Sequence, residues 1–466
     1  MKTNRFDMIK KRIFVLIASL LIVFHITGIT VSAQTYQPTW ESLDKRPVPN
    51  WYPNAKFGIF IHWGLYSVPS WATNSNADGF GSNYAEWYWQ RLFAPNLKIH
   101  KEFVAFHERV YGKNFSYQQF APMFTAELFD PAQWASIFKA SGAKYVVLTS
   151  KHHDGYTLWP SAQSWNWNVN DIGPHRDLAG DLSAAVRKEG LHMGFYYSLF
   201  EWFNPQYKSD VDGYVRDRMI PQMKDLVTRY KPDVLWADGD WDHSAATWKS
   251  EPFLAWLFNE SPSKDSIVVN DRWGSDTKSA HGTFQTSEYG SGSVTGKRPW
   301  EETRGIGASF GYNRNESLDQ YSSSQQLVHE LIGTVARGGN LLLNIGPAAD
   351  GTIPVIMQQR LSDIGNWLKV NGEAIYETAS WKNAPAVTKE STLFFTQKQQ
   401  SVYAITTRWE KEIVIRNISK PSAVSMPGYN GKLAFSYKNG TLTIKMPALT
   451  PDIVPCQYAW VCRVDL

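Results

Sequence analysis

Seven short apolar runs in this chain each lead to a side chain able to do polar chemistry, and they constrain the fold more than any other feature. The runs are residues 57–62, 145–148 leading to His152, His153 and Asp154, 194–197, 233–239, 267–272, 284–288 and 341–344. Short buried strands separated by helix-length stretches predict a parallel sheet with crossover helices. In a barrel of this kind, active-site residues lie at the carboxyl ends of the strands. We therefore expect an α/β fold with a (β/α)8-like, TIM-type barrel, regular or irregular.

The end of the chain has a different character from the part that carries these runs. After the helix-like stretch 355–370, short β-rich runs alternate with turn signals such as Asn430-Gly431 and Asn439-Gly440. The β-rich runs are residues 393–395, 402–405, 413–415, 433–435 and 442–444. We therefore predict a catalytic barrel domain over residues 34–376 and a C-terminal antiparallel β-sandwich domain over residues 377–466.

The first 33 residues have the composition of a secretory signal peptide. A basic start precedes an apolar stretch from residue 13 to about residue 31, and small residues lie just before Gln34. A membrane anchor is the alternative, but His25 and Gly28 are among the residues that interrupt the apolar run. We expect cleavage after Ala33, export to a periplasm or the medium, and no membrane attachment afterwards.

Charge and cysteine content limit the kinds of partner and scaffold. The chain has 47 Lys and Arg against 43 Asp and Glu, and removing residues 1–33 leaves 42 of each. A formally neutral mature protein argues against a phosphate-binding basic surface, so we expect no nucleic-acid partner. The two cysteines, Cys456 and Cys462, are too few to scaffold a chain of this length.

Aromatic residues are abundant, with 21 Trp, 22 Tyr and 24 Phe. The C–H faces of sugar rings stack on aromatic planes, while sugar hydroxyls need oriented donors and acceptors. Any one Trp or Tyr is more often a large core residue with a polar tip. Several of them beside strand-end histidines and carboxylates favour a carbohydrate-binding pocket.

Asp238, in the run 233–239, is the strongest candidate for a catalytic nucleophile. Hydrolysis of a glycosidic bond uses one group that attacks or stabilises the anomeric carbon and another that protonates the leaving oxygen. Asp238 shares strand parity with Trp236, so both side chains should point to one side of the sheet. Asp240 and Asp242 follow beyond the strand, where a solvated carboxylate is the default, and they rank second and third.

Glu288 is the first candidate for the acid/base because it also ends an apolar run. Its rivals are Glu301 and Glu302, which have the alternative interpretation of loop residues that pair with arginine. Sequence spacing does not give the distance between carboxyl groups, so position alone favours Glu288 only modestly.

The pair His152-His153 has two interpretations, metal ligation and hydrogen bonding to hydroxyls. Neighbours on an extended segment point to opposite sides, and no HExxH motif or cysteine cluster accompanies them. Hydrogen bonding is the simpler interpretation, so we expect neither a metal site nor a cofactor.

Eight segments together resemble the signatures of the family 29 glycoside hydrolases, the α-L-fucosidases. They occur in order between about residue 51 and residue 376, and the C-terminal part fits the family's layout without a diagnostic motif. The segments are residues 57–64, 84–88, 151–155, 194–198, 235–239, 270–274, 305–313 and 338–347.

The resemblance implies roles for particular residues. It makes Asp238 the nucleophile and Glu288 the acid/base, the latter position being variable in the family. The residues that match positions lining the fucose pocket are His62, Glu86, Trp87, His152, His153, Tyr197, Trp236 and Arg272. Residues 309–313 resemble the subfamily that accepts simple aryl fucosides.

The implied activity is that of an exo-acting, retaining α-L-fucosidase that releases terminal α-L-fucose from fucosylated glycans by double displacement. Two alternatives remain open from the residues alone. One is a non-catalytic fucose-binding lectin, and the other is a glycosidase for a different sugar on the same barrel.

Overall fold

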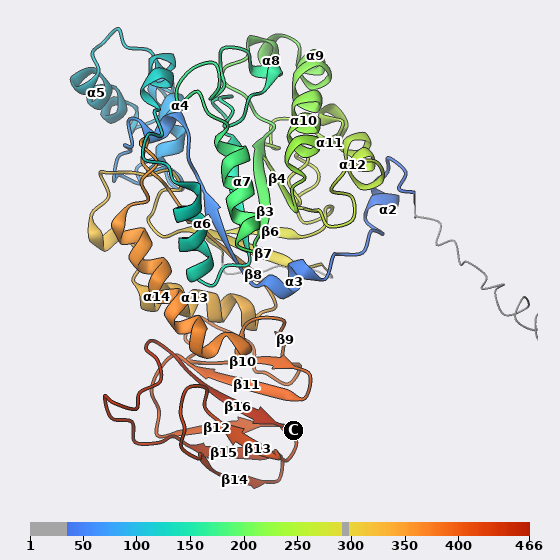
Figure 1. The fold of residues 1–466 in the computed structure, drawn as a ribbon, viewed down its shortest axis with the longest axis vertical. Coiled ribbons are helices and arrows are strands. Elements are labelled where there is room, and N and C mark those ends of the chain that lie inside the picture. The colour runs from blue at the N-terminus through green and yellow to red at the C-terminus, as the bar shows by residue number, and fades with distance from the viewer. Residues whose placement is uncertain (1–34, 291–297) are drawn as a thin grey trace, which may run out of the picture. The chain divides into compact units, whose positions relative to one another are not determined.

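Eight parallel strands form the central sheet of the N-terminal part of the chain (Figure 1). The structure is a computed structural model that describes residues 35–290 and 298–466. The strands are β1 (Phe57–Ile61), β2 (Tyr145–Lys151), β3 (His192–Ser198), β4 (Val234–Asp238), β5 (Val268–Val269), β6 (Gln285–Glu288), β7 (Trp300–Gly305) and β8 (Asn340–Ile345). Their order in the sheet is β5-β4-β3-β2-β1-β8-β7-β6. Because β1 lies between β2 and β8, this is the strand order of a (β/α)8 barrel.

The barrel is irregular where β5 and β6 meet. No ladder joins these two strands in the described part of the chain, and β5 has only two residues. Single contacts bridge the seam instead: the backbone N–H groups of Thr283 and Phe284 donate to the carbonyl oxygen of Val269 over 2.8 and 3.2 Å. The curled sheet therefore closes through isolated hydrogen bonds at this one seam.

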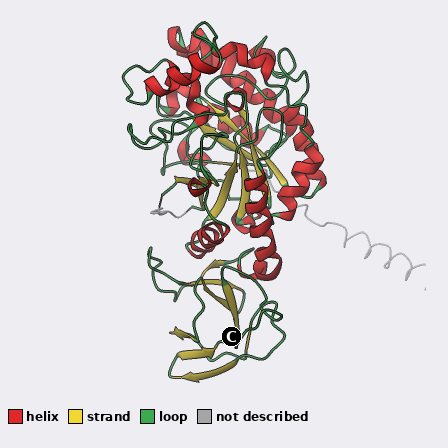
Figure 2. Ribbon diagram, turned by 90° about the vertical axis from the view of Figure 1, so that its left-hand side faces the viewer, coloured by secondary structure: helices red, strands yellow, loops and turns green. Residues whose placement is uncertain are grey.

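Helices surround the strands, as Figure 2 shows. Every residue of β1, β2, β4 and β8 is buried, as expected for parallel strands covered on both faces. The longer helices are α5 (His100–Val110), α6 (Pro131–Ala140), α7 (Leu178–Lys188), α10 (Ile220–Tyr230), α12 (Ser250–Asn259), α13 (Ser324–Ala336) and α14 (Val355–Asn371). The shorter ones are α2 (Trp40–Leu43), α3 (Trp51–Ala55), α4 (Tyr88–Leu92), α8 (Pro205–Ser209), α9 (Val211–Tyr214) and α11 (Ala245–Trp248).

Several short segments of tighter or wider helix lie between these elements. The 3-10 turns are Leu65–Ser67, Ala85–Trp87, Tyr117–Met123, Ala162–Ser164, Leu318–Gln320 and Gly372–Ala374, and a π-helical turn spans Val215–Met219. The turn Ala85–Trp87 carries two of the residues predicted to line the pocket, Glu86 and Trp87.

Strand β7 is the strand that the sequence did not predict. Its sequence, Trp-Glu-Glu-Thr-Arg-Gly, is polar, and the interpretation of Glu301 and Glu302 as loop residues is wrong. Glu301 points into the barrel interior, where tyrosine and tryptophan side chains bind it. Glu302 belongs to the opposite parity and pairs with Arg304 over 2.8 Å. Internal hydrogen bonds and ion pairs thus replace the apolar side chains that usually mark a buried strand.

Two antiparallel sheets form the C-terminal part, which confirms the predicted β-sandwich. One has the order β13-β16-β11-β10-β9 and the other the order β12-β15-β14. Apolar side chains from both sheets, including Phe395, Val464, Ile413 and Leu442, form one buried cluster. The strands are β9 (Ala379–Ser380), β10 (Leu393–Lys398), β11 (Ser401–Thr406), β12 (Glu412–Arg416), β13 (Ala423–Ser425), β14 (Ala434–Lys438), β15 (Thr441–Lys445) and β16 (Trp460–Asp465).

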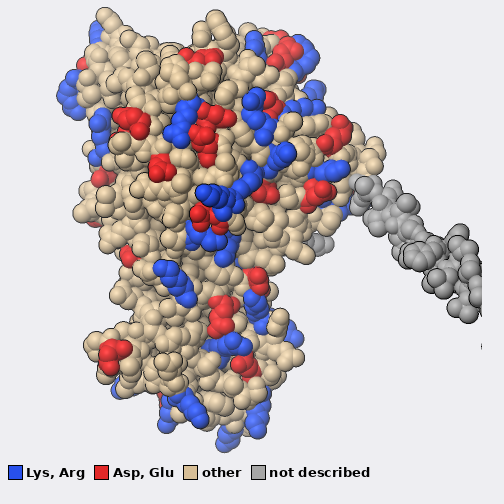
Figure 3. Space-filling view, viewed as in Figure 1, with Lys and Arg blue, Asp and Glu red and all other residues tan. Residues whose placement is uncertain are grey.

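Other expectations concern the termini, the cysteines and the surface. The predicted signal segment, residues 1–33, lies outside the described residues. Within residues 35–290 and 298–466, no helix has both the length and the apolar composition that crossing a bilayer requires. Cys456 and Cys462 are both free thiols. On the face drawn in Figure 3, basic and acidic side chains are interspersed.

Candidate active site

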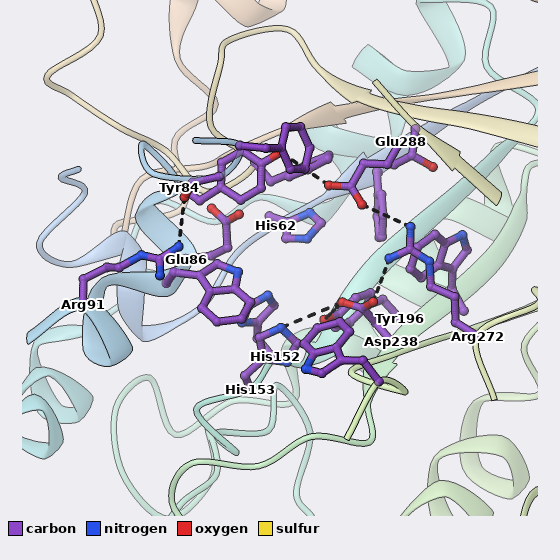
Figure 4. Close-up of a pocket in the computed structure, with 18 residues that line it drawn as sticks. His62, Tyr84, Glu86, Arg91, His152, His153, Tyr196, Asp238, Arg272 and Glu288 are labelled. Atoms are coloured by element: carbon purple, nitrogen blue, oxygen red, sulfur yellow. Dashed lines mark hydrogen bonds and ion pairs between the residues drawn. The ribbon is translucent and has the colours of Figure 1, made fainter. Parts of the chain in front are cut away.

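A cavity of about 360 Å³ lies at the carboxyl ends of the barrel strands (Figure 4). Strands β1 to β7, or the residues directly after them, each contribute at least one side chain. The lining residues are Phe60, His62, Phe80, Gly81, Tyr84, Glu86, Trp87, Arg91, His152, His153, Tyr196, Trp236, Asp238, Trp241, Arg272, Glu288, Thr303 and Phe310. This is the position in which barrel enzymes carry their active sites.

Asp238, the last residue of β4, is held by two donors. Its Oδ1 atom accepts a hydrogen bond from Nη1 of Arg272 over 2.8 Å, and its Oδ2 atom accepts one from the hydroxyl of Tyr196 over 2.8 Å. The side chain is 12% exposed. The guanidinium charge and the second donor compensate for the burial of the carboxylate.

Glu288, the last residue of β6, binds the same guanidinium from its other side. Its Oε2 atom lies 3.1 Å from Nη2 of Arg272, and its Oε1 atom accepts a longer hydrogen bond of 3.4 Å from Tyr84. The Glu288 side chain is 24% exposed, twice the fraction of Asp238. Figure 4 shows both carboxylates facing the cavity and joined through Arg272.

Arg272 is held in place by Thr286 and Trp236. Its Nε atom donates to the hydroxyl of Thr286 over 3.1 Å, and that hydroxyl donates to Asp271 over 2.7 Å. The guanidinium carbon lies 4.7 Å from the centre of the Trp236 ring, within the range of a cation–π contact. Burial lowers the pKa of Arg272, but the charges of Asp238 and Glu288 outweigh it and raise the pKa above its ordinary value.

His62 and His153 present acceptor nitrogens. Nδ1 of His62 lies 2.7 Å from Oδ1 of Asn344, and since Nδ2 of that amide donates to a carbonyl, the network assigns the proton to Nδ1. Burial lowers the pKa of His62 to about 4, so the ring is neutral and its Nε2 is free to accept. The same argument assigns the proton of His153 to Nδ1. This atom lies 2.6 Å from the hydroxyl oxygen of Ser198, and the serine hydroxyl itself donates to a carbonyl. Its Nε2 lies 3.9 Å from Asp238.

His152 adds a third neutral ring. Burial and the neighbouring histidines lower its pKa well below the ordinary value. Its ring lies nearly parallel to that of Tyr196, with centroids 5.6 Å apart, and in the described structure its buried Nδ1 has no hydrogen-bond partner. The three histidines together line the cavity with uncharged hydrogen-bonding groups.

Glu86 and Trp87 come from the turn Ala85–Trp87. Oε2 of Glu86 accepts from the backbone N–H of Gly311 over 2.8 Å and from Ser309 over 3.3 Å. Burial raises the pKa of Glu86 to about 7. The ring of Trp87 meets His153 edge-on, with centroids 5.1 Å apart.

The structure brings together nine of the ten predicted site residues and places the tenth elsewhere. Tyr197 does not line the cavity: its hydroxyl donates to Gln222 over 2.7 Å, on the opposite side of β3. Its neighbour Tyr196 points into the cavity instead. Successive side chains of a strand alternate, and Tyr196 is in register with Trp236, an inward-pointing residue of β4.

The lower-ranked carboxylates lie outside the cavity. Asp240 is buried nearby, and burial together with Asp238 raises its pKa to about 6. Asp242 accepts a hydrogen bond from Tyr207 over 2.8 Å. Glu301 lies below the cavity floor, where it accepts from Nε1 of Trp236 over 3.0 Å.

Sequence reasoning missed several lining residues. Tyr84 and Phe310 lie within segments that carry the family resemblance, so a signal for them existed. Phe80 lies in a loop without any periodic pattern, Arg91 lies in the short helix α4, and Thr303 belongs to the unpredicted β7. Across residues 35–290 and 298–466, no group of three or more His, Cys, Asp or Glu side chains is arranged to hold a metal ion.

Two carboxyl groups facing one sugar-sized cavity at the end of a barrel place the protein among the glycoside hydrolases. Comparison with known proteins identifies the family. Residues 23–373 match the family model described as alpha-L-fucosidase, and residues 387–465 match that of the alpha-L-fucosidase C-terminal domain. The chain therefore belongs to the alpha-L-fucosidase family and is a glycoside hydrolase with α-L-fucosidase activity. The predicted domain boundary at residues 376 and 377 lies between the two matches and stays a prediction.

Individual relatives agree with the family match. The chain is 46% identical to an alpha-L-fucosidase of Branchiostoma floridae, over 92% of this chain and 95% of that protein. It is 42% identical to the tissue alpha-L-fucosidase of Homo sapiens, over 92% and 91%. The crystal structure of Thermotoga maritima alpha-fucosidase with a mechanism-based inhibitor superposes with a TM-score of 0.79 at 38% identity, covering 92% of this chain and all of that one.

Replacing Glu301 by glutamine should change how stability depends on pH. Burial raises the pKa of Glu301 to about 7, from an ordinary value of 4.5. A raised folded-state pKa stabilises the protein below the unfolded pKa, and this contribution is lost as the pH rises through the folded pKa. Between about pH 5 and about pH 8, the unfolding free energy of Glu301→Gln should therefore rise relative to the parent, by up to about 3 kcal/mol.

Urea unfolding of both proteins at several pH values measures this difference. Glu390→Gln is the control, because Glu390 is exposed and a hydrogen bond from Thr388 lowers its pKa. The control should gain no stability with rising pH. Parallel stability curves for Glu301→Gln and the parent would contradict a raised pKa at Glu301.

Proposed function

We propose that Asp238 is the nucleophile and Glu288 the acid/base of a retaining α-L-fucosidase. The observation that carries this proposal is the sharing of one buried guanidinium, that of Arg272, by the two carboxylates inside a sugar-sized cavity. Retaining glycosidases need two close carboxyl groups on opposite sides of the scissile bond, about 5–5.5 Å apart. Asp238 and Glu288 each bind one of the two Nη atoms of Arg272, so they lie beside the same guanidinium, which supports their assignment as a pair.

The surroundings of the two groups favour these roles over the reverse assignment. Asp238 is the more buried carboxylate and has short hydrogen bonds to both of its oxygens, which hold it in one orientation for attack. Glu288 has longer contacts and is more exposed. An acid/base must exchange protons with water in each cycle, so the more open position suits Glu288.

The proposed reaction has two displacements. In the first, an oxygen of Asp238 bonds to the anomeric carbon as the bond to the leaving oxygen breaks, and protonated Glu288 gives its proton to that oxygen. In the second, Glu288 takes a proton from water, whose oxygen bonds to the anomeric carbon while the bond to Asp238 breaks. Fucose leaves with its original anomeric configuration, and Glu288 is protonated again.

The rest of the cavity supports recognition of a single fucose unit. Its volume of about 360 Å³ is near the lower end of the usual range for ligand pockets, which suits one sugar ring and exo action. Neutral His62 and His153 offer acceptor nitrogens to sugar hydroxyls, and Glu86 adds a carboxyl group. We assign the aromatic lining, including Trp236 and Phe310, to the apolar faces of the sugar and its methyl group.

A fucose-binding lectin would need the pocket but not its paired carboxylates. Binding alone gives no reason to hold two acids on one arginine, because burying charge is costly. The substrate proposed is therefore a terminal α-L-fucose on a glycan, released by hydrolysis.

Export is proposed on the composition of residues 1–33. Expression of the full chain in a host with a secretion pathway should yield a protein that begins at Gln34, because the small residues before it form the predicted cleavage site. Intact-mass spectrometry is the measurement, since an N-terminal glutamine can cyclise and block stepwise sequencing. Recovery of the uncleaved chain in the membrane fraction would contradict export.

Replacing Asp238 by glycine should lower kcat on 4-nitrophenyl α-L-fucoside by at least about 10³-fold, because the covalent intermediate cannot form. NMR should show α-L-fucose as the first product of the parent. Added azide should restore turnover in the variant and give the β-azide, since only one displacement then occurs. Asp242→Asn is the matched control and should keep parental turnover. A first product of β-configuration from the parent would exclude double displacement.

Replacing Glu288 by glutamine should make the rate depend strongly on the leaving group. Acid assistance matters for a poor leaving group, so kcat/KM on methyl α-L-fucoside should fall by about 10²–10⁴-fold. On 2,4-dinitrophenyl α-L-fucoside, which needs no proton, the first displacement should change little. Glu302→Gln tests the rival carboxylate and should affect both substrates equally. An equal loss on both substrates for Glu288→Gln would remove Glu288 from the acid role.

A further inference from the structure

Phe80 is a large apolar side chain at the rim of the cavity, and most of it is open to solvent. It lines the cavity, yet 69% of its surface is exposed. Burying a phenylalanine side chain is worth about 1.5–3 kcal/mol. A ring left exposed beside an active site is therefore available to a ligand.

The neighbours of Phe80 place it on the acid/base side of the cavity. Its ring meets those of Tyr84 and Tyr289 at 74° and 72°, with centroids 5.5 and 5.8 Å apart. The hydroxyl of Tyr84 donates a hydrogen bond to Glu288, and Tyr289 directly follows Glu288 in the chain. Neither tyrosine is stacked parallel to Phe80.

The turn that carries Phe80 is anchored. Gly79 and Gly81 flank it with φ angles of +86° and +78°, which side chains rarely adopt. The carbonyl of Gly79 accepts from the backbone N–H and the hydroxyl of Ser82 over 3.2 and 2.7 Å, and that of Gly81 accepts from Nη2 of Arg91 over 3.0 Å. These hydrogen bonds fix the backbone on both sides of Phe80.

Trp241, the other exposed ring of the cavity, has a different place. It is 44% exposed and lies three residues after Asp238. Its ring meets His153 at 80° and lies 6.3 Å from Trp87, at 24° to it. These contacts put Trp241 on the side where the nucleophile and the sugar-binding groups lie, so Phe80 is the exposed ring of the leaving-group side.

We propose that Phe80 forms the binding platform for the sugar unit that leaves when fucose is released. This inference rests on the proposed role of Glu288, since an acid that protonates the glycosidic oxygen must face the leaving unit. The ligand is a pyranose with a continuous C–H face, such as galactose, which packs on the phenyl ring while its hydroxyls stay in water. Binding energy from this unit, realised in the transition state, raises kcat/KM for a disaccharide.

The test compares Phe80→Ala with the parent on two substrates that share the fucose unit. One is an α-L-fucosyl-galactose disaccharide, and the other is α-L-fucosyl fluoride, whose leaving group has no ring. Loss of one apolar contact should lower kcat/KM on the disaccharide by about 10-fold and leave the fluoride unaffected. Phe80→Trp should retain activity on the disaccharide. Phe93→Ala is the matched control, since Phe93 is 72% exposed and does not line the cavity.

Two results would contradict the proposed role of Phe80. One is an equal loss of kcat/KM on both substrates, which indicates a structural role, and the other is no loss of kcat/KM on either substrate. Failure of the parent to hydrolyse the fluoride would contradict the proposed function and not the platform. Calorimetric binding to the Asp238→Gly protein keeps the platform testable in that case. When Phe80→Ala is combined with Asp238→Gly, binding of the disaccharide should weaken and binding of methyl α-L-fucoside should not. Equal affinities for the disaccharide with and without the Phe80 side chain would contradict the proposed role of Phe80.

Discussion

The ion pairs of Arg272 are the interaction on which the rest of the site depends. One guanidinium holds Asp238 and Glu288 on its two Nη atoms, and its Nε atom is tied to Thr286. Removing charge from water is costly unless every group finds a partner. The chain meets this requirement by stacking the guanidinium over Trp236 and by fixing Thr286 through Asp271. The geometry of the two carboxylates follows from these contacts.

A layer of hydrogen bonds below the cavity supports the residues above it. Glu301 accepts three hydrogen bonds, from the hydroxyls of Tyr52 and Tyr145 and from the indole N–H of Trp236. Trp236 in turn lies nearly parallel to Tyr196 and below Arg272, the two groups that bind Asp238. The floor of the site is therefore a polar network inside the barrel. Its hydrogen bond from Trp236 to Glu301 holds the indole ring that Tyr196 and Arg272 both contact.

Much of the fold could be predicted from the sequence because parallel strands buried on both faces are apolar. The same reasoning failed for β7, in which glutamates satisfied by internal partners replace apolar residues. Sequence reasoning found residues that line the cavity where a strand ends on a polar side chain, as at Asp238 and Glu288. The resemblance assigned a pocket position to Tyr197, but the structure places Tyr196 there, because neighbouring residues of a strand face opposite sides of the sheet. Phe80 lay beyond reach, since no periodicity marks an exposed ring in a loop.

The seam between β5 and β6 joins the two strands that position Arg272 and Glu288. Arg272 follows β5 and Glu288 ends β6, so their ion pair, together with the hydrogen bonds from Thr286 to Asp271, spans the gap that no ladder closes. Backbone pairing sets the spacing of neighbouring strands everywhere else in the barrel. At this seam the two backbone hydrogen bonds to Val269 are supplemented by these side-chain contacts, so side chains supply part of the connection between the strands. A ligand that displaces Glu288 from Arg272 therefore removes one of the contacts that join β5 to β6.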